Sequence, residues 1–153
     1  MKKVILIVVG KSKEESFLKE EKEYLKRLRN IQLDIIELKA QPTKDKNDDQ
    51  VIEKITSLSN KTKPPTILLD EKGAQYNSIN FSNWLYSKLE SNLSAPLVFV
   101  IGGAEGHGDT IKQFANESIT LSKMTLPHRL ARLIFIEQIY RAETIQLQHP
   151  YHK

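Results

Sequence analysis

The chain holds 153 residues, which is room for one domain with a full hydrophobic core, since domains run to roughly 100–200 residues. Hydrophobic residues make up 39% and charged residues 27% of it, a balance that excludes the disordered and membrane-spanning classes of protein. The chain has no cysteine, so disulfide scaffolds, cysteine-based zinc sites and thiol nucleophiles are excluded as well.

The formal net charge of +4 is spread unevenly along the chain. Residues 1–30 hold nine Lys or Arg and five Asp or Glu, residues 31–117 hold nine and twelve, and residues 118–153 hold five and two. Two basic ends around an acidic middle predict an anionic partner, provided that the fold brings both ends to one face. A merely solvated surface is the alternative that charge alone leaves open.

The first residues imitate a secretion signal, because two lysines precede an apolar run. That run, Val4–Val9, ends after six residues and is followed by charged rather than small residues. Signal peptides need about 7–15 apolar residues and a small-residue cleavage site. We therefore expect a buried first strand and a cytoplasmic protein.

The first half of the chain continues with helix and strand patterns in turn. Lys13–Leu28 predicts a helix, because apolar side chains recur there at mostly helical spacing on a charged background. Gln32–Leu38 predicts the second strand. Gln41–Asp49 is polar and rich in charge, which predicts an exposed, mobile loop, and Gln50–Leu58 predicts a short amphipathic helix.

The second half repeats this alternation. Thr66–Leu69 predicts a third strand and Asp70–Gly73 a turn, and Ser78 and Ser82 are expected N-caps of the helix that follows. The remaining expected elements are a helix at Ser78–Leu93, a strand at Leu97–Ile101, a helix at Asp109–Asn116, a strand at Ser118–Leu121, and a last helix from about Pro127 to Leu147. We therefore predict one α/β domain over residues 1–153, with a mostly parallel sheet flanked by helices.

A glycine cluster directly after the strand Leu97–Ile101 marks the expected functional site. Gly102, Gly103 and Gly106 lie within five residues of one another. Glycine lets a ligand or a second stretch of backbone approach closely. Open α/β sheets bind their ligands beyond the carboxyl ends of their strands, so we expect a ligand here. A tight turn without a ligand is the alternative.

Several other kinds of site are disfavoured by their spacing. A P-loop would need glycine at Ile5, and a dinucleotide-binding fingerprint would need glycine at Ile111. No serine lies in a G-x-S-x-G elbow. His149 and His152 are spaced like a metal-binding pair, but Pro150 lies between them and no third ligand is evident, so no metal is expected.

Five motifs together resemble one enzyme family. They are DEKG (Asp70–Gly73), VIGGAEG (Val100–Gly106), LSKMTLPH (Leu121–His128), EQIYRAE (Glu137–Glu143) and HPYHK (His149–Lys153). In this order and at this chain length, they resemble the ribosomal RNA large subunit methyltransferase H family, which are small enzymes of the SPOUT class. The resemblance covers essentially the whole chain.

The resemblance implies an S-adenosylmethionine-dependent enzyme that methylates N3 of a pseudouridine in helix 69 of 23S rRNA, on the assembled ribosome or large subunit. It also implies a homodimer and an α/β fold with a C-terminal trefoil knot, an exception to the rule that chains do not thread loops. The cofactor residues that the motifs imply are Leu69, Gly102, Leu121, Ser122, Lys123, Met124, Thr125 and Leu126.

Elementary chemistry agrees with such a cofactor site. Leu69, Gly102 and Leu121 each lie at the end of an expected strand, so one cleft can collect them. A sulfonium cation disfavours a strongly basic pocket, so Lys123 should point away from it. Gly102→Val should abolish cofactor binding and leave the fold intact, because its side chain would stand where the cofactor approaches the backbone.

Methyl transfer requires an aligned nucleophile, which can contribute roughly 7–11 kcal/mol, and a group that takes the N3 proton. The candidate catalytic residues are Tyr151, His152, Glu137 and Arg141. Glu137 and Arg141 lie four residues apart on the last helix, so an ordinary helix ion pair is the alternative for these two.

The basic residues near the end of the chain are the expected RNA contacts, some of them reaching the partner's active site across the dimer. They are Arg129, Arg132, His149 and Lys153, with Arg141 and His152. A frayed terminus is the alternative for the tail. The expected dimer interface is the apolar surface of the last helix, contributed by Leu130, Leu133, Ile134, Phe135, Ile136, Ile139 and Tyr140.

Two other functions stay open on the sequence. One is a SPOUT-like methyltransferase of tRNA, and the other is a non-catalytic, ribosome-associated module that binds RNA.

Overall fold

A five-stranded sheet organises the chain, and the structure, a computed structural model, describes all of residues 1–153. Its strands pair in parallel in the order β2-β1-β4-β3-β5. The strands are β1 (Lys2–Val9), β2 (Ile31–Leu38), β3 (Thr66–Gln75), β4 (Leu97–Ile101) and β5 (Glu117–Thr120). The helices are α1 (Glu15–Arg27), α2 (Lys44–Ser57), α3 (Ser78–Ser91), α4 (Asp109–Phe114) and α5 (His128–Gln146). The predicted mostly parallel α/β architecture is confirmed.

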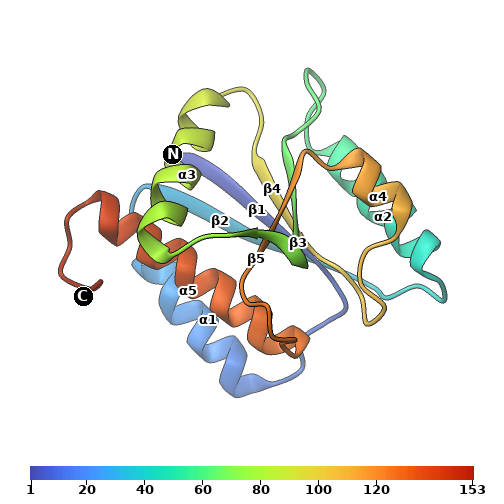
Figure 1. Ribbon diagram of the computed structural model, residues 1–153, viewed down its shortest axis with the longest axis horizontal. Coiled ribbons are helices and arrows are strands. Elements are labelled where there is room, and N and C mark those ends of the chain that lie inside the picture. Colours follow the sequence, from blue (N-terminus) through green and yellow to red (C-terminus); the bar gives the residue numbers. More distant parts are fainter.

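Helices cover both faces of the sheet, with α1, α3 and α5 on one side and α2 and α4 on the other (Figure 1). The side chains of β1 alternate between the two layers. Val4, Leu6 and Val8 enter the core shared with α3 and α5, whereas Ile5 and Val9 belong to the core shared with α2 and α4. A strand buried on both faces must be apolar at every position, which is why this run shows no polar alternation.

The segment Gln41–Asp49 is not the exposed loop that its composition predicts. Helix α2 already begins at Lys44, and Thr43 caps it by accepting a hydrogen bond from the N–H of Lys46 at 3.2 Å. Asp48 is only 3% exposed. The first turns of α2 carry few apolar residues, so hydrophobic periodicity could not reveal them.

The expected turn at Asp70–Gly73 is a bulge inside a longer strand. Strand β3 runs on to Gln75, and its register against β5 shifts between Leu69 and Ala74. A Cβ on Gly73 would lie 2.5 Å from the backbone of Ile119, so glycine lets β3 pass close to β5 here.

The N-cap of α3 is neither of the two expected serines but the residue before Ser78. The side chain of Asn77, not that of Ser78 or Ser82, accepts from the N–H of Asn80 at 2.8 Å. The Ser82 hydroxyl instead donates to the carbonyl of Ala142 at 2.7 Å and thereby joins α3 to α5.

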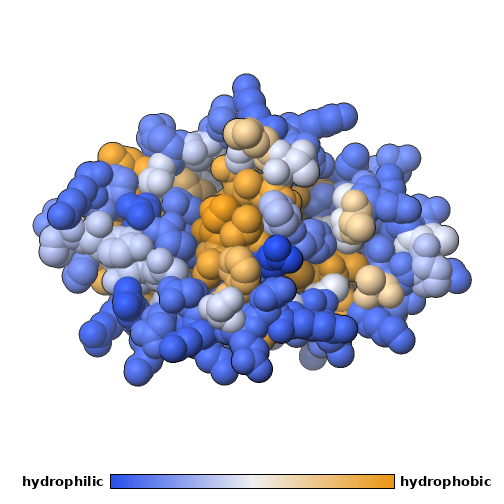
Figure 2. Space-filling model, turned by 90° about the horizontal axis from the view of Figure 1, so that it is seen from below, coloured by the Kyte–Doolittle hydropathy of each residue, from blue (hydrophilic) through white to orange (hydrophobic).

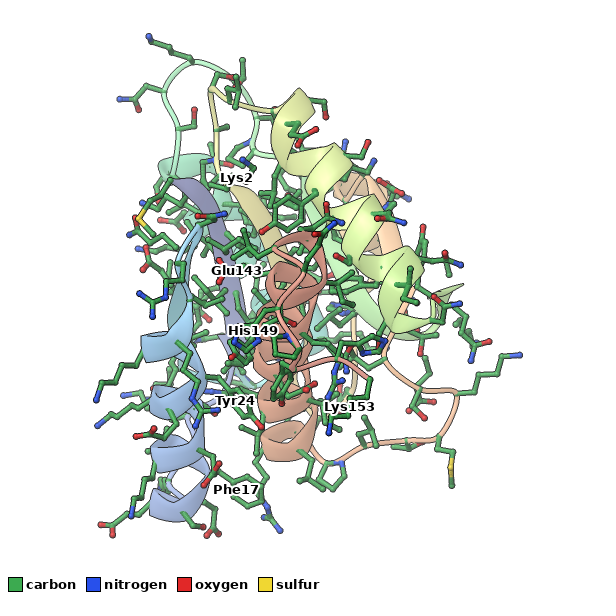
Figure 3. All side chains as sticks on the ribbon, turned by 90° about the vertical axis from the view of Figure 1, so that its left-hand side faces the viewer. Lys2, Phe17, Tyr24, Glu143, His149 and Lys153 are labelled. Carbon is green, nitrogen blue, oxygen red and sulfur yellow. The ribbon has the colours of Figure 1, made fainter.

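The last helix, α5, is held along its whole length by its neighbours. Near its end Glu143, 1% exposed, accepts hydrogen bonds from the N–H groups of Arg29, Asn30 and Ile31 at 2.8, 2.6 and 2.9 Å. Figure 3 shows Glu143 and Tyr24 along the boundary between α5 and α1. These contacts fix α5 relative to the start of β2.

None of the helices combines the length and the apolar character that crossing a bilayer would require.

Candidate active site

A pocket of about 380 Å³ opens where β4 and β5 end, beside the bulge in the middle of β3, as expected for a ligand site of an open α/β sheet. Its volume falls within the range of roughly 300–1,000 Å³ that small-molecule sites occupy. It brings together seven of the eight residues expected to bind the cofactor: Leu69, Gly102, Leu121, Ser122, Met124, Thr125 and Leu126. The eighth, Lys123, is exposed and does not line the pocket.

One wall of the pocket is the loop that follows β4. The N–H of Gly106 donates to the carbonyl of Gly103 at 2.9 Å, and Gly106 has a φ of +78°, a conformation that favours glycine. A Cβ on Gly102 would lie 3.0 Å from the carbonyl carbon of Gly106 and 3.1 Å from Nδ1 of His107. The packing of the loop itself therefore requires glycine at position 102. This corrects the expectation that a valine there would disturb only the cofactor.

Asp48 anchors the far end of the same loop from α2. Its carboxylate accepts hydrogen bonds from the N–H groups of Gly108 at 3.1 Å and Ile111 at 3.2 Å. The first N–H groups of a helix have no partner within the helix and carry partial positive charge. Asp48 thus caps α4 from a different element and fixes where the glycine loop ends.

His107 joins two walls of the pocket. Its Nε2 lies 3.0 Å from the carbonyl oxygen of Leu69, and because a carbonyl only accepts, Nε2 carries the proton. Burial lowers the pKa of His107 below its ordinary value of 6.5, outweighing the hydrogen bond to Leu69 and the nearby Asp70 and Asp48, which raise it. The imidazole is therefore neutral at neutral pH and ties the loop after β4 to the middle of β3.

The wall after β5 is ordered by local hydrogen bonds. The Thr120 hydroxyl donates to the carbonyl of Ser122 at 2.6 Å and accepts from its N–H at 3.1 Å. The hydroxyl of Ser122 in turn accepts from the N–H of Met124 at 2.9 Å. These bonds hold the run 121–126 in place, so that it presents backbone and apolar side chains to the pocket.

The charged side chains that line this pocket are mostly acidic. Asp70, Glu71 and Glu105 contribute three carboxylates, against one ammonium group from Lys72. A site with this balance attracts a cation and disfavours a second anion. The pocket is therefore suited to a positively charged ligand.

The four candidate catalytic residues form one cluster, to which the second half of α5 contributes Glu137 and Arg141 and the C-terminal tail contributes Tyr151 and His152. Oε1 of Glu137 accepts from Nε of Arg141 at 2.9 Å, from Nη2 of Arg141 at 2.6 Å and from the hydroxyl of Tyr151 at 3.0 Å. Nη1 of Arg141 lies 3.0 Å from Nδ1 of His152. Because an arginine only donates, Nδ1 of His152 is the acceptor and carries no proton.

This cluster holds the C-terminal tail against the protein. The ring of Tyr151 packs edge-on against that of Tyr140, with centroids 4.8 Å apart. Gln148 has a φ of +56°, and the N–H of His149 donates to the carbonyl of Thr144 at 2.9 Å, which turns the chain back after α5. Figure 3 shows His149 and Lys153 on the α5 side of the molecule. The tail is therefore packed and not frayed.

The cluster favours uncharged tyrosine and charged arginine. Burial raises the pKa of the Tyr151 phenol above its ordinary value, and its hydrogen bond to Glu137 raises it further. The bond to Glu137 likewise raises the pKa of Arg141. In this arrangement Tyr151 is a hydrogen-bond donor and a stacking surface, and it is not poised to accept a proton.

The cluster of candidate catalytic residues and the pocket are separate within one chain. Ala131 is the last residue of α5 that lines the pocket, and Glu137 lies six residues later, about 9 Å along the helix axis at 1.5 Å per residue. The structure thus brings together the predicted cofactor residues, and separately the predicted catalytic residues, but not the two groups.

The expected RNA contacts divide into exposed and buried residues. Arg129 is exposed, with its guanidinium 5.7 Å from the ring centre of Phe17, and His149 and Lys153 are exposed on the tail. Arg132 is only 5% exposed, and it binds the carboxylates of Glu21 and Glu37. This corrects the expectation that Arg132 contacts RNA, because its charge is enclosed and already balanced.

Asp48 and His107, which hold the loop after β4 in position, were not predicted from the sequence. Asp48 lies in a polar stretch, and its partners in α4 are sixty residues away, so no local pattern signals it. His107 stands directly after the glycine cluster, and this proximity was the one available signal. No three or more His, Asp or Glu side chains are grouped so as to hold a metal ion; Nδ1 of His149 instead accepts from the N–H of Tyr151.

Comparison with known proteins agrees with this geometry. Residues 1–152 match the family model described as "Predicted SPOUT methyltransferase". Proteins named "Ribosomal RNA large subunit methyltransferase H" from Bacteroides fragilis and Parabacteroides distasonis are each 40% identical to the chain, and each alignment covers 98% of both proteins. Among solved structures, the SpoU methyltransferase AviRb from Streptomyces viridochromogenes aligns with 92% of this chain and 57% of its own, at 10% identity and a TM-score of 0.44, too low a similarity to add to the assignment. The family model and the curated relatives span the whole chain, which therefore belongs to the SPOUT methyltransferase family and, within it, to the ribosomal RNA large subunit methyltransferase H proteins.

Proposed function

We propose that the protein transfers a methyl group from S-adenosylmethionine to N3 of a pseudouridine in helix 69 of 23S rRNA, in the cytoplasm, on the assembled ribosome or large subunit. The observation that carries the proposal is the end-to-end similarity to relatives whose name states a ribosomal RNA methyltransferase. The pocket at the ends of β4 and β5 and the bulge of β3 supports it, because it gathers most of the residues that the family motifs imply.

The residues of the pocket fit S-adenosylmethionine. When bound, this cofactor supplies an activated methyl group on a sulfonium cation. The acidic lining of Asp70, Glu71 and Glu105 suits that charge, and the loop at Gly102 exposes backbone that can recognise a base. His107 and Asp48 keep this loop in place and reduce the ordering that binding must impose.

The chain's own residues then have two tasks, to orient the target base and to remove its N3 proton. Glu137, Arg141, Tyr151 and His152 are the candidates, and their mutual hydrogen bonds hold them as one unit. Tyr151 offers an aromatic face for the base. His152 and Glu137 hold the proton-accepting atoms.

Because none of these four residues lines the pocket of its own chain, we propose that they act in the pocket of a partner in a homodimer. Helix α5 supports this arrangement. Phe135, Ile136, Ile139 and Tyr140, expected at the interface, are buried in the core of the chain, but Leu130, Leu133 and Ile134 remain partly exposed. Figure 2 shows an apolar area near the centre of the lower face of the molecule, surrounded by polar surface.

The trefoil knot and the single domain over residues 1–153 belong to the same proposal. The five strands form one sheet from β1 to β5, and the two layers of helices share it. This continuity supports a single unit of folding.

Mass-spectrometric mapping of 23S rRNA, from cells with and without the protein, tests the function. We expect one pseudouridine in helix 69 to lose its N3 methyl group when the protein is absent. Loss of methylation from tRNA would establish a tRNA methyltransferase instead. Unchanged RNA and no calorimetric signal with S-adenosylmethionine would establish a non-catalytic module.

A further inference from the structure

A second recess lies beside the active-site pocket, at the end of β1. It encloses about 310 Å³ and is formed by the segment from Gly10 to Glu14 together with the start of α5. We call it the basic recess, and the residues that matter in it are Lys11, Ser12, Lys13, His128 and Arg129. None of the motifs carried over from the family includes Lys11, Ser12 or Lys13.

Three of the positive charges around the basic recess have no ion-pair partner. Lys11, Lys13 and Arg129 line it, and none of them forms an ion pair. The one carboxylate in its lining is that of Glu14. Arg132 also borders the recess, but Glu21 and Glu37 already neutralise it. Three cations that line one hollow and form no ion pair attract an anion with several acceptor oxygens.

The wall of the recess holds a buried donor without a partner. Oγ of Ser12 is shielded from solvent and makes no hydrogen bond, although most buried polar groups find a partner. The N–H of Ser12 is fixed at 2.9 Å from Oε2 of Glu37, which keeps the residue in place. Ser12 lines the recess, and rotation of its hydroxymethyl group would let the free hydroxyl donate to an oxygen of a bound anion.

The recess adjoins the active-site pocket. His128 lines both hollows, at the N-terminal end of α5. The positive φ of Gly10, +113°, turns the chain after β1 so that residues 11–13 border the recess next to His128. An anion in the recess would therefore lie next to whatever is bound in the pocket.

We infer that the basic recess binds a phosphodiester of the RNA strand close to the nucleotide that is methylated. This inference rests on the proposed function, because that function makes RNA the substrate. The acidic lining of the pocket suits the cationic cofactor, and the basic lining of the recess suits the anionic RNA strand. Phosphate contacts fix the position of a nucleic acid without reading its sequence.

The test compares two double variants of equal charge change. Lys11→Ala with Lys13→Ala removes two of the three unpaired cations that line the recess. The control, Lys54→Ala with Lys61→Ala, removes two lysines near the amino ends of the strands. Binding to purified large ribosomal subunits is measured by co-sedimentation at graded KCl. We expect the recess variant to bind at least about tenfold more weakly and to flatten the slope of log Kd against log salt by roughly 1 to 2, since each phosphate contact contributes roughly 0.7 to 0.9. The control variant should bind like the wild type.

A second pair separates charge from shape at Ser12. Ser12→Asp adds a carboxylate to the recess, whereas Ser12→Asn adds a neutral group of equal size. We expect Ser12→Asp to weaken ribosome binding several-fold relative to Ser12→Asn, with unchanged calorimetric affinity for S-adenosylmethionine in both.

Equal losses in the two double variants, no loss in the recess variant, equal binding by the two Ser12 variants, or no sedimentation of the wild type would each overturn the inference. Methyl transfer to the same subunits is assayed separately. If the wild type sediments with them but transfers no methyl group, the proposed function fails, and the recess is judged on the binding data alone.

Discussion

His107 is a buried side chain whose protonation should affect the loop that lines the candidate cofactor pocket. Its neutral imidazole connects the loop after β4 to the carbonyl of Leu69, and burial lowers its pKa below the ordinary value of 6.5. In the unfolded chain the imidazole takes up a proton more readily than in the folded protein. The unfolded state then binds more protons, so the free energy of unfolding falls as pH drops through 6.5 toward the lower folded pKa.

We therefore predict that stability declines as pH falls below 6.5, and that His107→Leu removes this part of the pH dependence. Urea unfolding of both proteins at graded pH measures it. We expect the variant to have a lower free energy of unfolding at neutral pH, and this free energy should change less with pH than in the wild type. Parallel profiles for the two proteins would show that His107 does not titrate between the folded and unfolded states.

Residue by residue, the sequence could identify the pocket but not its supports. Leu69, Gly102 and Leu121 line one pocket as expected, because Gly102 and Leu121 follow the ends of neighbouring parallel strands and Leu69 lies at the bulge of β3 between them. Asp48 could not be predicted, since its partners are contributed by α4. The ion pairs of Arg132, which was expected to contact RNA, could not be predicted for a related reason. Its partners Glu21 and Glu37 are distant in the chain, and only the fold brings them together.

Among the elements, the loop after β4 is the one in which a single substitution should affect cofactor binding most. We predict that Gly102→Val weakens S-adenosylmethionine binding at least about a hundredfold, or about 2.8 kcal/mol. The cause is a collision of its side chain with Gly106 and His107, which moves the loop. Calorimetry measures the affinity, and thermal unfolding measures the accompanying loss of stability.

Gly106→Asn is the matched control for that variant. Its φ of +78° is one that asparagine tolerates, and a Cβ there meets no atom within 4 Å. Cofactor affinity should therefore stay close to that of the wild type. Equal weakening by both substitutions would mean that the loop tolerates no side chain at all, and wild-type binding by Gly102→Val would remove the loop from the site.

The C-terminal tail is the other element with a separable role. Deletion of Pro150–Lys153 removes Tyr151 and His152 but leaves Glu137, Arg141 and the pocket. We predict that methyl transfer to ribosomes falls by roughly 10²–10⁴-fold, the range typical of lost acid–base catalysis, while calorimetric affinity for S-adenosylmethionine is nearly unchanged. Full methylation by the truncated protein would exclude Tyr151 and His152 from catalysis.

Elements were predictable from the sequence where burial leaves a regular pattern. β1 and β4 are apolar at nearly every position because both faces are covered, and α5 was bounded within a residue or two. The start of α2 and the bulge in β3 could not be predicted, because the polar residues there are held by a cap and by close passage of β5. The trefoil knot stays a prediction, since no local spacing records how a chain threads.

At the scale of the whole molecule, the apolar side chains left on α5 predict a homodimer. We expect sedimentation velocity at micromolar concentration to give twice the mass of the chain. Leu133→Asp should yield a folded monomer, because it places a charge on a partly exposed apolar surface that the core does not need. A monomeric wild type, or an unchanged dimer of the variant, would contradict this interface.

The separation of the pocket from the tail has a genetic consequence. No residue of the tail lines the pocket of its own chain, so in the proposed homodimer two defective alleles should complement each other. One allele would encode Gly102→Val and the other the chain without Pro150–Lys153, and each alone should leave rRNA unmethylated. When the two chains are expressed together in equal amounts, about a quarter of all active sites should be intact, and methylation of the rRNA should return. Half of a random population of two-fold dimers is mixed, and each mixed dimer holds one intact active site out of two. Absence of this interallelic complementation would place the tail and the pocket of the same chain in one active site after all.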